Sequence, residues 1–170
     1  MKLWYSPASP FVRKVIAAAH ECGLADRIDI VDAATTPINR NPQLVADNPV
    51  GKIPAMVLDD GTALFDSRVI CAYLDEMAGG GKVLPTGGRE RIRAMTLEAL
   101  GDGIMDAAVL ARYEGFLRPQ EFRWQGWIDG QLAKVASALD SLDRDWRSEL
   151  EGPVNVGQLA VAAAIGYLDF

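Results

Sequence analysis

The stretch YSPASPFVRKV, Tyr5 to Val15, contains two prolines, Pro7 and Pro10, with a serine between them. Lys2–Tyr5, which ends at the first residue of this stretch, suits an extended segment. Its later residues begin an apolar helical face formed by Val12, Val15, Ile16 and Ala19. Proline is compatible with the first turn of a helix, because its missing N–H has no helical partner there. The stretch therefore predicts a first strand joined to a first helix by a short turn.

Short extended and helical patterns continue to alternate after this helix. A β-like segment, Ile28–Val31, is followed by a half-apolar segment, Gln43–Gly51. Two strand-like pieces, Pro54–Leu58 and Ala63–Phe65, flank an Asp-Asp-Gly turn, which is a hairpin signal. A helix from Ser67 follows, and its apolar face holds Ile70, Tyr73, Leu74 and Met77. The predicted order is β-α-β-α-β-β-α.

Glycine-rich sequence separates this α/β unit from an all-helical remainder. Gly79–Gly81 and Leu84–Gly88 form a linker, because repeated glycine with a proline cannot continue a helix. The clearest later pattern has the 4-3-4-3-4 spacing of the core stripe of a bundle helix and comprises Ile128, Leu132, Val135, Leu139, Leu142 and Trp146. A final helix is expected to run to Phe170 from Asn155, which has the form of a capping box with Gln158.

Composition and charge exclude several classes of function. A net charge of -6 and a pI near 4.8 argue against nucleic-acid binding, which requires a basic surface. Cys22 and Cys71 fit no C-x-x-C redox or zinc spacing and indicate buried thiols in a reducing compartment, without a disulfide. His20 is the one histidine, so a metal site is poorly supported. No signal-peptide core and no apolar run of about 18 residues is present, so we expect a cytoplasmic protein with no membrane partner.

Four short motifs lie far apart in the chain. They are SPFVRKV at 9–15, NPVGKIP at 48–54, FDS at 65–67 and the capping-box helix at 155–170. Together they resemble motifs of the cytosolic glutathione S-transferases: the catalytic-serine turn, the N-P-x-G-K-[VI]-P segment, the [DE]-S glutathione site and the core helix of the second domain. The first motif and Ala99–Ala107 are also similar to the small bacterial YibF-like group of that family.

The resemblance implies an α/β plus all-α fold, with a thioredoxin-like N-terminal domain and a helical-bundle C-terminal domain. Combined with the linker, it gives domains at residues 1–79 and 89–170, joined by residues 80–88. Family members usually continue for a further helix or two, so we expect the second domain to lack the usual last helix or helices. The resemblance also implies a homodimer that takes glutathione as co-substrate. We expect no metal, because His20 is the single histidine.

Ser9 is the candidate catalytic residue. A free cysteine thiol has a pKa of about 8.5, so an enzyme that uses glutathione at pH 7 must stabilise the thiolate. A serine hydroxyl at the start of the first helix can donate a hydrogen bond to that sulfur, and the helix N-terminus adds about half a positive charge. The alternative is that Ser9 only caps the helix, which is worth about 1 kcal/mol.

The candidate glutathione-binding residues, beside Ser9, come from several segments. A cis bond between Ile53 and Pro54, implied by the resemblance, would turn the Ile53 backbone toward the cysteine unit of glutathione. The sequence alone favours a trans bond at an edge strand. Asp66 can accept from the γ-glutamyl ammonium, and Ser67 can cap the next helix and offer backbone N–H groups to the γ-glutamyl carboxylate. Lys52 can pair with the glycine carboxylate. Capping alone for Ser67 and solvation for Lys52 are the alternatives.

Glu98, Asp102 and Asp106 form an acidic stripe at i, i+4 and i+8 of one helix, where like charges cost roughly a few tenths of a kcal/mol per pair. The resemblance places this helix along the dimer cleft. Asp102 is therefore a candidate for binding the amine of the glutathione held by the neighbouring subunit. The alternative is a solvated face.

Three aromatic residues, Trp4, Phe11 and Tyr113, are candidates for an apolar electrophile pocket, and Phe11 is also a candidate glutathione contact; core positions are the alternative for each. Two functions fit these residues. The first is a glutathione transferase of alkyl or aryl groups, acting in detoxification, in which Ser9 activates the thiol for attack on a small apolar electrophile or for a related glutathione-dependent reaction. The second is a non-catalytic module of the same fold that binds glutathione or a protein partner. Serine rather than cysteine at the turn disfavours thiol–disulfide exchange.

Overall fold

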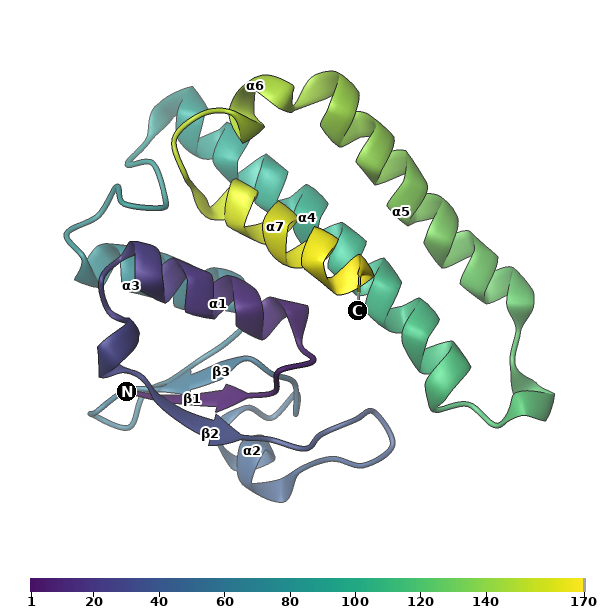
Figure 1. The fold of residues 1–170 in the computed structure, drawn as a ribbon. Coiled ribbons are helices and arrows are strands. Elements are labelled where there is room, and N and C mark those ends of the chain that lie inside the picture. The colour runs from purple at the N-terminus through teal and green to yellow at the C-terminus, as the bar shows by residue number, and fades with distance from the viewer. Residues whose placement is uncertain (170) are drawn as a thin grey trace.

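The structure, a computed structural model, describes residues 1–169 and combines an α/β part with a layer of helices (Figure 1). The α/β part contains β1 (Lys2–Tyr5), α1 (Pro10–Glu21), β2 (Asp29–Asp32), α2 (Pro42–Asp47), β3 (Ala55–Val57), β4 (Ala63–Leu64) and α3 (Ser67–Met77). A 3₁₀ turn, Ala25–Arg27, lies between α1 and β2. The order β-α-β-α-β-β-α predicted from the sequence is confirmed.

The sheet has the strand order β2-β1-β3-β4. β1 runs parallel to β2 and antiparallel to β3, which pairs antiparallel with β4. Side chains alternate between the two faces of β1, so Leu3 joins the core beneath α1 and α3 while Trp4 joins a smaller core on the α2 side. Figure 1 shows α1 and α3 on one face of the sheet and α2 on the other. This mixed sheet with helices on both faces is the thioredoxin-like fold.

The remaining helices are α4 (Gly88–Phe116), α5 (Gln125–Asp145), the short α6 (Arg147–Leu150) and α7 (Val156–Leu168), with a 3₁₀ turn at Gln120–Phe122. α7 packs against both α1 and α4 (Figure 1). Two glycines allow its close approach to α4. A Cβ added to Gly101 would lie 2.7 Å from the carbonyl carbon of Ala160, and one added to Gly157 would lie 2.7 Å from Cβ of Leu97. α7 thus packs against both parts of the molecule.

The N-terminus of α7 has the predicted capping box. Oδ1 of Asn155 accepts from the backbone N–H of Gly157 at 2.9 Å, and the backbone N–H of Asn155 donates to Oε1 of Gln158 at 2.8 Å. The helix ends at Leu168, and Phe170 lies outside the described residues.

A buried carboxylate, Asp75, fixes the linker between α3 and α4. Its Oδ1 accepts from the backbone N–H groups of Val83 at 2.7 Å and Leu84 at 3.1 Å, and its Oδ2 accepts from that of Gly81 at 2.9 Å. Burial raises the pKa of Asp75, but these N–H bonds outweigh burial and hold the pKa below its usual range. Val83 in turn accepts from the backbone N–H of Val156 at 2.8 Å, which ties the linker to α7.

The stripe predicted as core on α5 is only partly buried. Val135 and Leu142 are buried, but Leu132 is 49% exposed and Leu139 is 36% exposed. The prediction is therefore wrong for these two leucines. The physical reason is that α5 packs mainly against one long helix, α4, whereas burial of the whole stripe requires neighbours on both sides.

Both cysteines are buried and free. Burial raises the pKa of the Cys71 thiol to about 12, and it also raises the pKa of Cys22. Cys71 is therefore a protonated thiol at neutral pH, which is typical of a core residue rather than a nucleophile.

Candidate functional site

A cavity of about 330 Å³ lies where the α/β part meets α4. Phe11 at the start of α1 and Asp102 and Asp106 of α4 form part of its wall. The rest comes from the loop before β3 and the start of α3, with Asn48, Val50, Lys52, Ile53, Pro54, Phe65, Asp66, Ser67 and Arg68. Motifs far apart in the sequence therefore meet in one cavity. Every predicted glutathione-binding residue except Ser9 lines it.

The loop that forms one wall is held by Asn48, whose side chain is buried. Its Nδ2 donates to the carbonyl of Lys52 at 2.8 Å, and its Oδ1 accepts from the backbone N–H of Val50 at 3.1 Å. The Ile53–Pro54 bond that follows is cis, as the resemblance implied and against the trans bond that the sequence alone favoured. The loop is thus fixed by an amide side chain, and both Lys52 and Ile53 border the cavity.

Asp66, rather than Ser67, caps α3. Oδ1 of Asp66 accepts from the backbone N–H of Arg68 at 3.0 Å, while Ser67 is the first helical residue and is buried. The prediction that the Ser67 side chain caps this helix is wrong. The carboxylate of Asp66, one residue earlier, already accepts from the backbone N–H of Arg68. The bond between Phe65 and Asp66 is also cis. The first turn of α3 borders the cavity with Asp66, Ser67 and Arg68.

Ser9 is the N-cap of α1. Its Oγ accepts from the backbone N–H of Val12 at 3.3 Å. Accepting this bond uses a lone pair of the hydroxyl and leaves its hydrogen available to donate. Ser9 does not line the cavity, whereas Phe11, two positions along, does. The capping interpretation is therefore confirmed, and the catalytic role of Ser9 stays a prediction.

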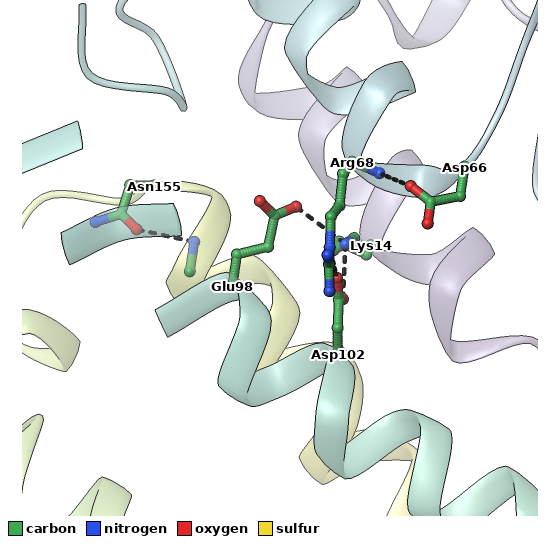
Figure 2. Close-up of polar contacts among 7 residues, drawn as sticks. Lys14, Asp66, Arg68, Glu98, Asp102 and Asn155 are labelled. Atoms are coloured by element: carbon green, nitrogen blue, oxygen red, sulfur yellow. Dashed lines mark hydrogen bonds and ion pairs between the residues drawn. The ribbon is translucent and has the colours of Figure 1, made fainter. Parts of the chain in front are cut away.

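An ionic cluster joins three helices beside the cavity and contains the buried Lys14, Glu98 and Asp102 and the half-exposed Arg68 (Figure 2). Nζ of Lys14 on α1 donates to Oε1 of Glu98 at 3.0 Å and to Oδ1 of Asp102 at 2.7 Å. The other carboxylate oxygen of Asp102 accepts from Nε of Arg68 on α3 at 2.6 Å. Each carboxylate of this cluster therefore has a cationic partner from another helix.

This cluster corrects the interpretation of the acidic stripe. Glu98 and Asp102 are buried, so the solvated face applies only to Asp106, which is exposed. The repulsion between the two buried acids is offset within the chain by Lys14 and Arg68, and a ligand ammonium is not needed for that purpose. The contact of Asp102 with the glutathione of a neighbouring subunit stays a prediction.

Opposing effects set the pKa values in the cluster. Burial lowers the pKa of Lys14, but the charges of Asp102 and Glu98 outweigh burial, and the pKa is raised above its usual value. Burial raises the pKa of Glu98, and the attraction of Lys14 offsets this only in part. The hydrogen bond to Asp102 raises the pKa of Arg68. Lys14 and Arg68 are thus both charged at neutral pH.

Two of the three aromatic candidates lie away from the cavity. Trp4 is buried on the α2 side of the sheet, and its Nε1 donates to Oδ2 of Asp47 at 2.7 Å. The prediction of Trp4 as a pocket residue is therefore wrong, because strand alternation points it away from the face that carries α1. Phe11 lines the cavity. Tyr113 is half-buried on α4 beyond Asp106 and does not line the cavity, so its role stays a prediction.

Sequence reasoning missed Lys14, Arg68, Asn48 and Asp106 as residues of the site or its support. Two signals pointed to the cluster. Lys14 belongs to the first helix, directly before the apolar Val15, and Glu98 and Asp102 form an i, i+4 acidic pair that lacks a basic partner on its own helix face. A buried lysine and a buried acidic pair are each costly alone, which indicates that they pair with each other.

Sequence comparison connects these motifs to known proteins. The family model described as "Glutathione S-transferase, N-terminal domain" matches residues 8–77. The whole chain is 34% identical, over 173 aligned residues, to the uncharacterized GST-like protein YibF of Escherichia coli (strain K12), and it covers 83% of that protein. The chain belongs to the glutathione S-transferase family. Glutathione S-transferase 3 of Zea mays, a further relative, is 42% identical over 74 residues, which are 44% of this chain and 32% of the maize protein.

Solved structures of the family share the fold. A glutathione transferase family member from Pseudomonas fluorescens Pf-5, crystallised with bound glutathione, superposes with a TM-score of 0.97 at 46% identity, over 99% of this chain and 82% of that one. A glutathione S-transferase from Methylobacillus flagellatus KT, also with glutathione bound, gives a TM-score of 0.85 at 36% identity with the same coverage of each chain. The thioredoxin-like domain followed by a helical domain is thereby confirmed.

Within residues 1–169, no group of three or more His, Cys, Asp and Glu side chains is arranged to hold a metal ion. In the same part of the chain, no helix has the length and apolar character needed to span a bilayer.

Proposed function

We propose that the chain binds glutathione in the 330 Å³ cavity and uses its thiol in a transferase reaction. The observation that carries the proposal is the meeting of the NPVGKIP loop, the FDS turn and the start of α1 at one cavity. Structures of two similar family members contain glutathione, which supports the same ligand class here.

The charges around the cavity suit a ligand that is both anionic and zwitterionic. Lys52 and Arg68 are cations on its wall, and Asp66 and Asp106 are anions there. In this proposal Asp66 accepts from the γ-glutamyl ammonium, and the first turn of α3 with Ser67 binds the γ-glutamyl carboxylate. Lys52 pairs with the glycine carboxylate. The Ile53 backbone pairs with the cysteine unit as an added strand would.

In the proposed reaction, Ser9 donates a hydrogen bond to the glutathione sulfur and favours its thiolate. The sulfur then forms a bond to an electrophilic carbon of a small apolar compound, the leaving group departs with the electron pair of the broken bond, and the thiol proton passes to solvent. Phe11 on α1 and Tyr113 on α4 supply apolar surface for that compound. The proposed setting is cytoplasmic detoxification, in keeping with two free thiols.

We also propose that the chain forms a two-fold homodimer of subunits with domains at residues 1–79 and 89–170. α4 exposes apolar side chains on its outer face, namely Ile92, Met95 and Leu110. Such a face supports an isologous contact, which is the commonest way for soluble proteins to pair. Sedimentation at micromolar concentration tests this, with a monomer as the contradicting result.

A non-catalytic glutathione-binding module is the second candidate, and one observation favours it. Ser9, whose hydroxyl caps α1, is absent from the cavity wall, so its free hydroxyl hydrogen does not face the cavity in this structure. If that position is kept when glutathione binds, the site binds the tripeptide without activating its sulfur.

Turnover with a panel of electrophiles and hydroperoxides, in the parent and in Ser9→Ala, distinguishes the two candidates. The enzyme proposal expects Ser9→Ala to lower turnover by about 10²-fold, as for loss of a group that acts in the transition state, with little change in glutathione affinity. Equal turnover in both proteins would leave Ser9 as a helix cap. Glutathione binding without turnover for any compound would favour the module.

A further inference from the structure

Lys14 lies completely buried at the junction of α1, α3 and α4. Lysine is seldom fully buried, because removing its ammonium from water is costly unless partners compensate. Here Nζ has two carboxylates within hydrogen-bond distance, Glu98 at 3.0 Å and Asp102 at 2.7 Å. The two acids compensate the charge, but they do not by themselves explain why a charged cluster occupies this junction.

The two oxygens of Asp102 are divided between two cations. Oδ1 accepts from Nζ of Lys14, and Oδ2 accepts from Nε of Arg68 at 2.6 Å. The side chain of Arg68 is 51% exposed and borders the cavity, whereas that of Asp102 is 4% exposed. A continuous series of contacts therefore runs from the buried ammonium of Lys14, through Asp102, to a guanidinium on the cavity wall (Figure 2).

We propose that Lys14 is a positioning residue for glutathione binding. By fixing the carboxylate of Asp102, Lys14 holds the Arg68 guanidinium beside the first turn of α3, where its remaining N–H groups can meet a ligand carboxylate. The inference rests on the proposed function, because glutathione is the ligand that supplies this carboxylate. Lys14 itself does not line the cavity, so its effect on the ligand passes through Asp102 and Arg68.

A purely structural role for Lys14 makes a different prediction. If Lys14 only neutralised two buried acids, its removal would lower stability whatever residue stood at position 68, and any loss of affinity would be independent of Arg68. A positioning role makes the two side chains coupled, so their effects on affinity are not additive. A double-mutant cycle on glutathione affinity separates the two roles.

The experiment measures glutathione binding by calorimetry in the parent, Lys14→Met, Arg68→Ala and the double variant. We expect Lys14→Met to raise the dissociation constant about tenfold in the parent, the loss typical of one charged hydrogen-bonding group. In the Arg68→Ala background, we expect the same change to raise it less than about twofold. Asp75→Asn is the control, since it disturbs a buried carboxylate on the linker, remote from the cavity wall, and is expected to leave the affinity unchanged.

If Lys14→Met does not fold, Lys14→Met combined with Glu98→Leu replaces it, because removing an acid together with the lysine avoids an uncompensated charge. The cycle is then built on this pair, with the same expectation. Unchanged affinity in a folded variant, or an equal loss in both backgrounds, would overturn the inference while the proposed function stands. No binding of glutathione by the parent would overturn the proposed function and this inference with it.

Discussion

The molecule contains two regions where buried carboxylates are satisfied in different ways. Asp75 accepts three backbone N–H bonds from the linker, whereas Glu98 and Asp102 are held by the side chains of Lys14 and Arg68. Burial raises the pKa of both Asp75 and Glu98. In Asp75 the N–H bonds reverse that effect, and in Glu98 the lysine does not.

The comparison teaches that the type of partner decides what a buried acid does. Backbone donors have fixed positions, so the Asp75 region sets the path of the chain between α3 and α4. Side-chain donors come from separate helices, and one of them, Arg68, also reaches the candidate site. The first region is therefore structural, and the second connects the helix packing to the cavity.

The largest expected effect is on stability, from Lys14→Met. Removing one partner of a buried ionic group leaves charge uncompensated, and we expect the free energy of unfolding to fall by about 3 to 5 kcal/mol. Urea unfolding followed by circular dichroism measures this. A loss below about 1 kcal/mol would mean that the cluster is more hydrated than its burial indicates.

A smaller loss is expected from Asp75→Asn. The amide keeps one acceptor oxygen but presents NH₂ to backbone N–H donors, so we expect a loss of about 1 to 3 kcal/mol in the free energy of unfolding. The same urea experiment measures it. A loss equal to that of Lys14→Met would remove the distinction between the two regions.

The pH dependence of stability sharpens the comparison further. The pKa of Asp75 is lower in the folded protein than its unfolded value of about 3.9, so its contribution is present above that value and is lost as pH falls through the folded pKa. The contribution of Glu98 to stability changes in the opposite direction with pH. Because the pKa of Glu98 is raised in the folded protein, this contribution is present below about pH 4.3 and is lost as pH rises through the folded pKa. Urea midpoints of the parent should fall below about pH 4 more steeply than those of Asp75→Asn. If the urea midpoints of the parent and of Asp75→Asn change in parallel with pH, the lowered pKa of Asp75 is contradicted.

The smallest effect concerns Cys71, whose thiol lies near the ionic cluster. Burial raises its pKa to about 12, and the nearby Lys14 charge only partly opposes this. At pH 8 we therefore expect iodoacetamide to label Cys71 only when the protein unfolds, which mass spectrometry after partial labelling in urea can follow. Rapid labelling in native buffer would show that the junction opens without unfolding.

Local patterns in the sequence predicted the elements of the fold well, because helix caps, glycines and apolar spacing act within a few residues. The capping box at Asn155 and the hairpin before Ala63 are examples. The prediction for Trp4 is wrong because residue type alone does not show to which face of the sheet a strand side chain points. Leu132 and Leu139 were misplaced because spacing shows an apolar stripe but not how many helices will cover it.

The residues that hold the candidate site in place could not be predicted from the sequence as well as the elements of the fold. The Lys14–Asp102 pair joins residues on α1 and α4, and no local rule connects them. The cis Ile53–Pro54 bond followed from the resemblance and not from the residues alone. Motif residues that line the cavity are thus easier to predict than residues that hold them in place, because the latter depend on packing between distant segments.

Calorimetric titration of glutathione into the parent and into Asp66→Ala tests the central claim, that the cavity at the start of α3 is a glutathione site. We expect one binding site per chain in the parent and a loss of about 1 to 3 kcal/mol in binding free energy in Asp66→Ala, because the γ-glutamyl ammonium loses a charged partner. Absence of binding heat in the parent, or an unchanged affinity in a variant whose thermal stability has fallen, would contradict the claim and leave Asp66 as a helix cap alone.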